Sequence, residues 1–315
     1  MTAIVAWWTL KSVAVVADCR VTCPPERDKA DDCLQKLYQI GDRFVIGFAG
    51  PLQGAYEVLD FVRENWEQYR DPPIADNLLR DVERWIRFKY RQLRQNERRG
   101  LSFILAAVEP RTEKQAKWVT RDANGNERAS SKPSWFPFIP ECHITALKPA
   151  PSEPNELHKA QTGLCRIIGS AEKHREAIEA TVRHWYGFVH DQPHLQMQAV
   201  MGVLTAKLMP QRAERVGGLL QCALLGQNGV EWIGYGGVDV ALLYTEHGFV
   251  QYNTDTGETL PLMSIWQWAR GWEEGALQPG SLGTFEDARL REAIEKHRPA
   301  EKDPTPSKAK DSPEG

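Results

Sequence analysis

The chain opens with four short apolar runs that are separated by turns. The runs cover residues 4–8, 13–17, 34–40 and 44–48, and Gly41-Asp42 joins the last two. Apolar and β-branched runs of this length between turn residues are typical of strands that pair with their neighbours. The pattern therefore predicts two consecutive β-hairpins within residues 1–50.

After residue 50 the apolar residues recur at the three- and four-residue intervals of amphipathic helices. This spacing predicts helices at residues 52–69 and 78–93, which Asp71-Pro72-Pro73 separates, and further helices at 170–189 and 193–208. The outer face of the second helix carries arginines at positions 84, 87, 91 and 94. A solvated face is the favoured interpretation of this charge run, and a polyanion site is the alternative.

The remaining apolar runs predict further strands. The densest run, at 101–108, is typical of a strand buried on both faces. Asn124-Gly125 predicts a hairpin turn, with Trp118-Val119 and residues 143–147 as its strands. Four more strands are expected at 165–168, 219–225, 229–233 and 238–245. Hairpins, helix pairs and further strands in this order indicate the α+β class.

Composition narrows the class of protein only slightly. The chain has 315 residues, of which 42% are hydrophobic, enough for a sizeable core. A formal net charge of -3 gives no electrostatic case for binding nucleic acid or an anionic membrane. The six cysteines form no clustered ligand set, so we expect reduced thiols, no metal and no cofactor. Neither a membrane span nor a signal peptide is predicted, which indicates a cytoplasmic protein.

The polar residues around the first hairpins suit one chemistry. Removal of Met1 would leave Thr2 with a hydroxyl nucleophile beside an α-amine, whose pKa of about 8 lets it act as general base. A Lys36 ammonium nearby would lower the proton affinity of both groups, and Asp18 would pair with it. Gly50 would supply a backbone N–H to an oxyanion. Each residue alone has an ordinary structural explanation, but the four in this order favour a catalytic site.

These residues resemble the motifs of the proteasome β-subunit superfamily, the N-terminal-nucleophile hydrolases that include the bacterial peptidase HslV. The matching motifs are Thr2, Asp18-Cys19-Arg20-Val21-Thr22, Lys36-Leu37-Tyr38-Gln39-Ile40 and Gly47-Phe48-Ala49-Gly50. The resemblance implies that Thr2 is the nucleophile, that Asp18 and Lys36 are its charge pair, and that Gly50 forms the oxyanion hole. Pro51 departs from the small residue that many relatives have after this glycine.

The resemblance also implies a substrate-binding cleft. The residues expected to line it are Arg20, Val21, Thr22, Phe48 and Leu52. The string Ile167-Ile168-Gly169-Ser170 resembles the Gly-Ser that starts a helix beside the terminal threonine in the family. Ser170 would help to hold the threonine amine and its water. Its position also predicts a helix N-cap, and one hydroxyl can serve both roles.

A fold and an assembly follow from the same resemblance. It implies a four-layer αββα sandwich of two antiparallel sheets flanked by helices, spanning residues 1–252 with an elaborated hairpin at 109–160. A helical extension at 253–298 and a disordered tail at 299–315 would follow. Relatives stack homo-oligomeric rings into a barrel that admits polypeptide substrates, and an ATP-dependent unfoldase is a partner that the resemblance allows. The tryptophans of the extension, Trp266, Trp268 and Trp272, are candidates for ring contacts.

One departure from the family keeps the function open. Many catalytic relatives carry Asp-x-x-Ser before a Gly-Gly pair, whereas this chain has Trp232 and Tyr235 before Gly236-Gly237. Three functions are therefore considered: a threonine-type peptidase that forms an acyl-enzyme on Thr2, an amidase or acylase of the same superfamily acting on a small amide, and a catalytically silent ring subunit. The retained Thr2, Asp18 and Lys36 favour the peptidase.

Overall fold

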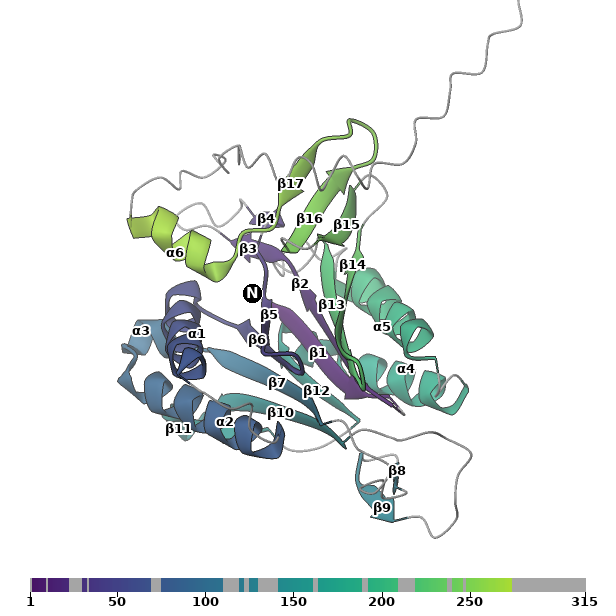
Figure 1. Ribbon diagram of the computed structural model, residues 1–315, viewed down its shortest axis with the longest axis horizontal. Helices are drawn as coiled ribbons and strands as arrows, with labels where there is room; N and C mark the ends of the chain where they lie inside the picture. The colour runs from purple at the N-terminus through teal and green to yellow at the C-terminus, as the bar shows by residue number, and fades with distance from the viewer. Residues whose placement is uncertain are drawn as a thin grey trace, which may run out of the picture. The chain divides into compact units, whose positions relative to one another are not determined.

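In the computed structural model, the two predicted amino-terminal hairpins belong to two different antiparallel sheets. The hairpin β1–β2 lies in the first sheet and the hairpin β5–β6 in the second (Figure 1). The structure describes residues 2–9, 11–22, 30–32, 34–68, 75–109, 119–121, 125–129, 141–160, 164–188, 192–208, 219–236, 240–245 and 248–273. All of these belong to the unit Met1–Leu282, whereas the second unit, Gly283–Gly315, lies outside the described residues.

Each of the two main sheets has five strands. The first, in the order β12-β1-β2-β13-β14, comprises Cys165–Gly169, Ala3–Trp8, Val13–Asp18, Leu220–Gly226 and Gly229–Tyr235. The second, in the order β11-β10-β7-β6-β5, comprises Glu153–Lys159, Glu141–Ala150, Ser102–Glu109, Phe44–Ala49 and Leu37–Ile40. Within each, neighbouring strands run antiparallel.

Three smaller sheets complete the described strands. One has three strands, β15 (Val240–Thr245), β16 (Gly248–Asn253) and β17 (Thr259–Pro261). The others are the pairs β3–β4 (Arg20–Thr22 with Ala30–Asp32) and β8–β9 (Val119–Arg121 with Glu127–Ala129). The domain boundary expected after residue 252 falls inside β16, which pairs with β17.

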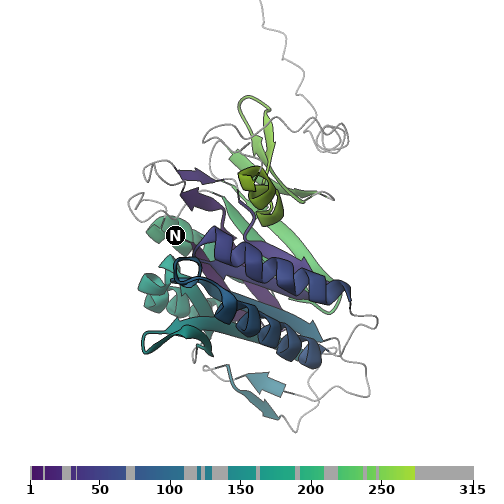
Figure 2. The same cartoon turned by 90° about the vertical axis from the view of Figure 1, so that its left-hand side faces the viewer.

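The α-helices form two pairs, a single-turn helix after the first pair, and a carboxy-terminal helix. Their bounds are α1 Leu52–Glu67, α2 Ala75–Gln92, α3 Gln95–Arg98, α4 Arg175–Phe188, α5 Pro193–Leu208 and α6 Ile265–Glu273, with a 3-10 helix at Ser170–His174. Figures 1 and 2 show α1 and α2 side by side along the second sheet, and α4 and α5 along the first. The fold is thus mixed α+β with antiparallel sheets, as the sequence predicts.

Three clusters of buried apolar side chains hold these elements together. One joins α1 and α2 to the second sheet, and another joins α4 and α5 to the first. The third contains residues of both main sheets, among them Ile4, Val15, Val45 and Ile144. In β7 odd-numbered residues such as Phe103 belong to the helix-side cluster and even-numbered ones to the third, which confirms the prediction of a strand buried on both faces.

The structure corrects three predictions of local structure. Residues 143–147 do not pair with the strand at 119 across the Gly125 turn; they lie in β10, which pairs with β7. The apolar positions of this run can be buried only beside the equally apolar β7. Leu195, which the helical spacing of residues 193–208 places in the core, is exposed, whereas Met197 and Met201 of α5 are buried as expected. Ser170 is the first residue of the 3-10 helix rather than its N-cap, which is Gly169.

The arginine-rich face of α2 is paired within the chain. Arg84, whose side chain is 75% exposed, lies 3.2 Å from Asp81, and Arg87 and Arg91 pair with Glu83 and Glu156. These ion pairs fit the predicted solvated face. Among the described residues, no helix is both long and apolar enough to cross a membrane. Four of the six cysteines lie within the described part of the chain, where all four are buried and none forms a disulfide.

Candidate functional site

The residues predicted to carry the chemistry lie where strands of both sheets end. β1 begins at Ala3, opposite Gly169, the last residue of β12. β2 ends at Asp18, opposite Leu220 at the start of β13. The second sheet reaches the same edge, because a Cβ added to Gly169 would lie 3.3 Å from the Cβ of Ala49 at the end of β6. This edge therefore brings together residues that are far apart in the sequence.

Asp18 and Lys36 form a buried ion pair at this edge. The Lys36 Nζ lies 3.0 Å from Asp18 Oδ1 and donates a second hydrogen bond of 2.5 Å to the carbonyl oxygen of Arg20. The two side chains are 1% and 0% exposed. Asp18 Oδ1 also accepts the Ala3 N–H at 2.9 Å. Since this N–H belongs to the peptide bond that joins Thr2 to Ala3, the ion pair lies directly beside Thr2.

Burial controls the acidity of Asp18. Removal from water raises the pKa of its carboxyl, while the Lys36 charge and the Ala3 hydrogen bond oppose that rise. The carboxyl's other oxygen, Oδ2, is buried and makes no hydrogen bond to any residue that the structure describes. A carboxylate accepts up to four hydrogen bonds, so Asp18 retains acceptor capacity at the site.

The Gly169-Ser170 turn fixes the backbone of Thr2. The Ser170 N–H donates a 2.7 Å hydrogen bond to the Thr2 carbonyl oxygen. Gly169 has a φ of +72°, and a Cβ on it would lie 1.7 Å from that oxygen, so only glycine permits this approach. Both Thr2 and Ser170 are buried. Because Ser170 does not cap the helix, its Oγ is left without a hydrogen bond among the described residues.

Two glycines shape the second sheet at this edge. A Cβ on Gly47 would lie 2.8 Å from Leu37 Cδ2 and 3.1 Å from Ile4 Cδ1, so this glycine lets the two sheets approach each other. Gly50, just beyond β6, has a φ of +128°, and a Cβ there would lie 2.6 Å from the Leu101 Cα. The backbone at Gly50 therefore requires glycine, and its role in an oxyanion hole stays a prediction.

The residues expected to bind substrate are less closely grouped. Arg20 contributes its carbonyl oxygen to the Lys36 ammonium. Val21 and Thr22 continue β3 beyond it, and their side chains lie outside the described part of the structure. Phe48 is fully buried in the cluster between the second sheet and α1, and Leu52 is the first residue of α1. Their contact with a substrate stays a prediction.

The strand order shows where Trp232 and Tyr235 lie, the two residues that stand in place of the Asp-x-x-Ser of many catalytic relatives. These residues lie in β14, the edge strand, which β13 separates from β2. The glycines that follow them lead into β15 of the three-stranded sheet. In contrast, β13, which pairs directly with β2 and Asp18, follows Gly217-Gly218 in the sequence. The sequence comparison used Gly236-Gly237, which follow β14. That strand does not neighbour Asp18.

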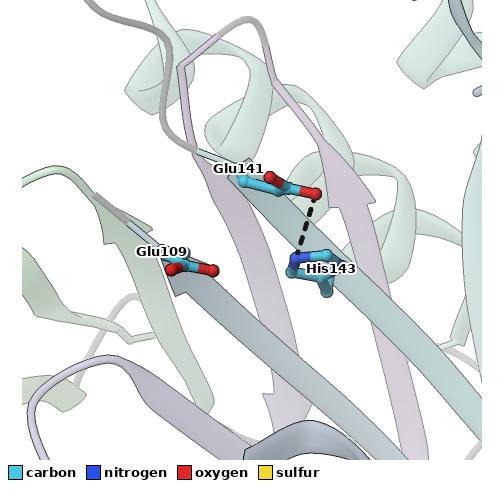
Figure 3. A group of neighbouring side chains, drawn as sticks. All are labelled: Glu109, Glu141 and His143. Carbon is cyan, nitrogen blue, oxygen red and sulfur yellow. Dashed lines mark ion pairs between the residues drawn. The ribbon is translucent and has the colours of Figure 1, made fainter. Parts of the chain in front are cut away.

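Sequence reasoning also missed a group with the donor types of a cation site. Glu109, Glu141 and His143 offer two carboxylate oxygens and an imidazole nitrogen within 4.8 Å of one another (Figure 3). The group becomes visible in the strand register, because Glu109 and Glu141 lie directly opposite each other across β7 and β10. His143 Nε2 lies 3.7 Å from Glu141 Oε1, and none of the three side chains is free of partners.

This group lies far from Thr2. Glu109 is seven residues along β7 from Ser102, which pairs with Ala49 at the candidate active site. At about 3.3 Å per residue in a strand, this separation is roughly 23 Å. We assign the group no part in the chemistry at Thr2.

Comparison with known proteins adds no family assignment. No family model matches the chain, and no curated protein matches its sequence closely enough to show a relationship. The functional argument therefore rests on the residues and on their geometry.

Proposed function

We propose that this chain is a threonine-type peptidase of the N-terminal-nucleophile hydrolases, with Thr2 as its nucleophile after Met1 is removed. The observation that carries the proposal is the buried Asp18–Lys36 pair, one oxygen of which also binds the amide that follows Thr2. A solvated lysine or a strand-ending aspartate would need no such arrangement. A buried ion pair is costly to desolvate, so its place beside a potential nucleophile favours a chemical role.

The arrangement of the cores supports the finer fold assignment. The three apolar clusters join one helix pair to the first sheet, the two sheets to each other, and the second sheet to another helix pair. We infer from this order the four-layer αββα sandwich of the superfamily. In that fold, strand ends from both sheets would form the active site, which agrees with the placement of Asp18, Lys36 and Gly169.

The proposed reaction begins with acyl transfer. The Thr2 Oγ would attack the carbonyl carbon of a peptide bond while its proton passes to the free α-amine of the same residue. The tetrahedral intermediate would collapse, the C–N bond would break, and the ammonium would return the proton to the leaving amine. A water molecule, deprotonated by the same amine, would then hydrolyse the Thr2 ester and restore the hydroxyl.

The surrounding residues have distinct roles in this scheme. Lys36 would keep the Thr2 amine unprotonated and stabilise the alkoxide that develops on the hydroxyl, while Asp18 holds the lysine. Asp18 Oδ2 and Ser170 Oγ, which have no hydrogen-bond partner among the described residues, are buried acceptors that would orient the α-amine. The Gly50 N–H would donate to the oxyanion.

The decisive test is an intact mass before and after treatment with a peptide epoxyketone, a reagent that needs both a hydroxyl and a free α-amine. We expect Met1 to be absent and one reagent to add to Thr2, with no addition to Thr2→Ala. A protein that keeps Met1, or that cleaves peptides without reacting, would overturn the proposal. Turnover of casein or fluorogenic peptides, against turnover of small acyl amides, separates the peptidase from the small-amide hydrolase.

The proposal extends to assembly and cellular setting. We infer a cytoplasmic, homo-oligomeric barrel of stacked rings with polypeptide substrates, since lone subunits of this fold would expose faces that rings cover. Trp266 packs against Tyr38 and donates a hydrogen bond to Asp60 within its own chain, and a part for this segment in ring contacts stays a prediction. Light scattering is expected to give the mass of a closed oligomer. A monomer at micromolar concentration would contradict the barrel.

A further inference from the structure

Gln221 is a fully buried polar side chain whose partners all surround Lys36. It lies in β13, one residue after Leu220, the partner of Asp18. Its Oε1 accepts the backbone N–H groups of Lys36 and Leu37 at 3.0 and 3.2 Å. Its Nε2 donates to the Leu34 carbonyl oxygen at 2.9 Å and to the Cys19 sulfur at 3.2 Å. These four bonds use the amide's full capacity of two acceptor sites and two N–H groups.

The bonds of Gln221 cross from one sheet to the other. Gln221 belongs to the first sheet, whereas Lys36 immediately precedes β5 of the second. Lys36 is therefore held by the first sheet at both ends: its backbone by Gln221, and its ammonium by Asp18. The ammonium also donates to the carbonyl oxygen of Arg20 in β3. A long flexible side chain is placed accurately only when its backbone is fixed as well.

We propose that Gln221 is the positioning residue for Lys36, and that it sets the place of the ammonium by fixing the backbone of the segment Leu34–Leu37. This role presupposes the threonine-peptidase function proposed above. Gln221 touches neither Thr2 nor a substrate in this scheme, and it acts only through Lys36. A shift of about 1 Å in a catalytic group can cost up to about 10²-fold in rate, so the loss of this bond pair should slow the chemical step.

The chain provides a matched control for this residue. Gln196 in α5 is also fully buried, but neither atom of its amide has a hydrogen-bond partner among the described residues. Replacing either glutamine by methionine keeps the side-chain length and removes only its hydrogen-bonding groups. Gln221→Met orphans three backbone groups, whereas Gln196→Met orphans none that the structure describes.

The first experiment compares steady-state peptide hydrolysis and hydrogen exchange in these two variants. We expect Gln221→Met to lower kcat by about tenfold or more with KM changed less than twofold, and to speed amide exchange in residues 34–40. Gln196→Met should alter neither. If Gln221→Met does not fold, Gln221→Asn, which keeps an uncharged amide but is one methylene too short to hold all four bonds, should give a smaller loss of kcat. Unchanged kcat and unchanged exchange in either folded variant would overturn the role.

A double-mutant cycle tests whether Gln221 acts through Lys36. In a Lys36→Ala background, Gln221→Met should cause no further loss in kcat, because the group that it positions is gone. An equal further loss would overturn the role and assign Gln221 to general stability.

If the wild-type protein hydrolyses no peptide, the function proposed above fails. Site-resolved hydrogen exchange in the wild type then tests by itself whether Gln221 holds the backbone of Lys36 and Leu37. The Lys36 and Leu37 amides should be as protected as those of the β5–β6 ladder, and free exchange there would disprove the contact.

Discussion

The segment Leu34–Leu37, which carries Lys36, is held by two regions. They differ in their chemistry and in how well their contacts can be predicted from the sequence. The amino-terminal hairpin β1–β2 reaches it through charge: Asp18 binds the ammonium, and the Arg20 carbonyl just beyond β2 accepts a second hydrogen bond. The contact with Asp18 is buried and the contact with Arg20 is partly buried, and both act on the tip of the side chain. This region determines where the positive charge of Lys36 lies.

The carboxy-terminal segment around β17 and α6 reaches the same residues through backbone and aromatic contacts. Gln35 donates its N–H to the Met263 carbonyl oxygen at 2.9 Å, and Leu34 forms an isolated bridge with Met263. The Tyr38 hydroxyl donates to the Gln35 carbonyl oxygen and accepts the Ile265 N–H at 2.8 Å. The Trp266 ring meets that of Tyr38 edge-on, with centroids 4.9 Å apart.

The difference between these regions separates charge placement from backbone placement. The hairpin residues are those to which the proposal assigns the chemistry, while the carboxy-terminal segment lies outside the family resemblance and contacts the chain that carries Lys36. Loss of a hairpin contact should therefore abolish the chemistry directly. Loss of a carboxy-terminal contact should weaken it through the backbone.

The largest effect is expected at Thr2 itself. A protein that carries an uncleaved amino-terminal tag should fold but show no hydrolysis, because an amide nitrogen cannot serve as the base. Thr2→Ala should match the blocked protein, and Thr2→Ser should keep part of the activity. A carboxy-terminal tag is the matched control and should change nothing. Robust turnover by a protein whose mass shows an intact amino-terminal extension would rule out the terminal nucleophile.

The second-largest effect is expected when the positive charge of Lys36, which the hairpin holds, is removed. Lys36→Ala should lower the rate of acyl-enzyme formation by about 10²-fold or more, by analogy with deleting other stabilisers of transition-state charge. The fold should survive, since burial already favours the protonated form of Asp18, which can then take up a proton. Epoxyketone labelling rates and circular dichroism measure the two effects. Near-normal turnover would remove Lys36 from the site.

The hairpins, the helix pairs and the Thr2–Asp18–Lys36 set could be predicted because each leaves a local pattern. The period of the apolar residues placed β1, β2, β5 and β6, and the order of the motifs that carry Thr2, Asp18 and Lys36 grouped these three residues. Gln221 left no such signal, because one glutamine within an apolar strand shows neither its burial nor its partners. Its contacts with Lys36 span 185 positions in the sequence and depend on which strand neighbours β2.

The carboxy-terminal contacts could not be predicted from the sequence, for the same physical reason. The segment's helix was predicted, but nothing in its pattern shows that Met263 and Ile265 meet Gln35 and Tyr38. Residues 143–147 were assigned the wrong partner because alternation identifies a strand and not its neighbour.

A smaller effect is expected at Tyr38, on the carboxy-terminal side. Tyr38→Phe should cost about 1 kcal/mol of unfolding free energy and lower kcat a few-fold, because the hydroxyl no longer joins Gln35 to Ile265. Tyr90→Phe is the matched control, since that buried hydroxyl shares its one proton between the carbonyl oxygens of Arg98 and Pro154 in the second sheet's helix-side region. It should cost similar stability and leave kcat unchanged. Equal kcat values for the two variants would show that the carboxy-terminal segment does not support the site.

The smallest expected effect is the pH dependence of stability that Asp18 contributes. Because burial raises its pKa, the folded protein binds the Asp18 proton more tightly than the unfolded chain, where an aspartate has a pKa of about 3.9. The stability that Asp18 contributes is therefore fully present below about pH 3.9 and is lost as the pH rises through the folded pKa.

Urea unfolding of wild type and Asp18→Asn at a series of pH values isolates this contribution, because other carboxyls cancel in the difference between the two proteins. The difference, wild type minus variant, should fall as the pH rises through that window and then level off. For Tyr38→Phe the same difference should stay flat, since burial raises the pKa of the Tyr38 hydroxyl further above this range. A wild-type advantage over Asp18→Asn that grows with pH would mean that the Lys36 charge outweighs burial. The hairpin contact would then stabilise the fold as well as the proposed chemistry.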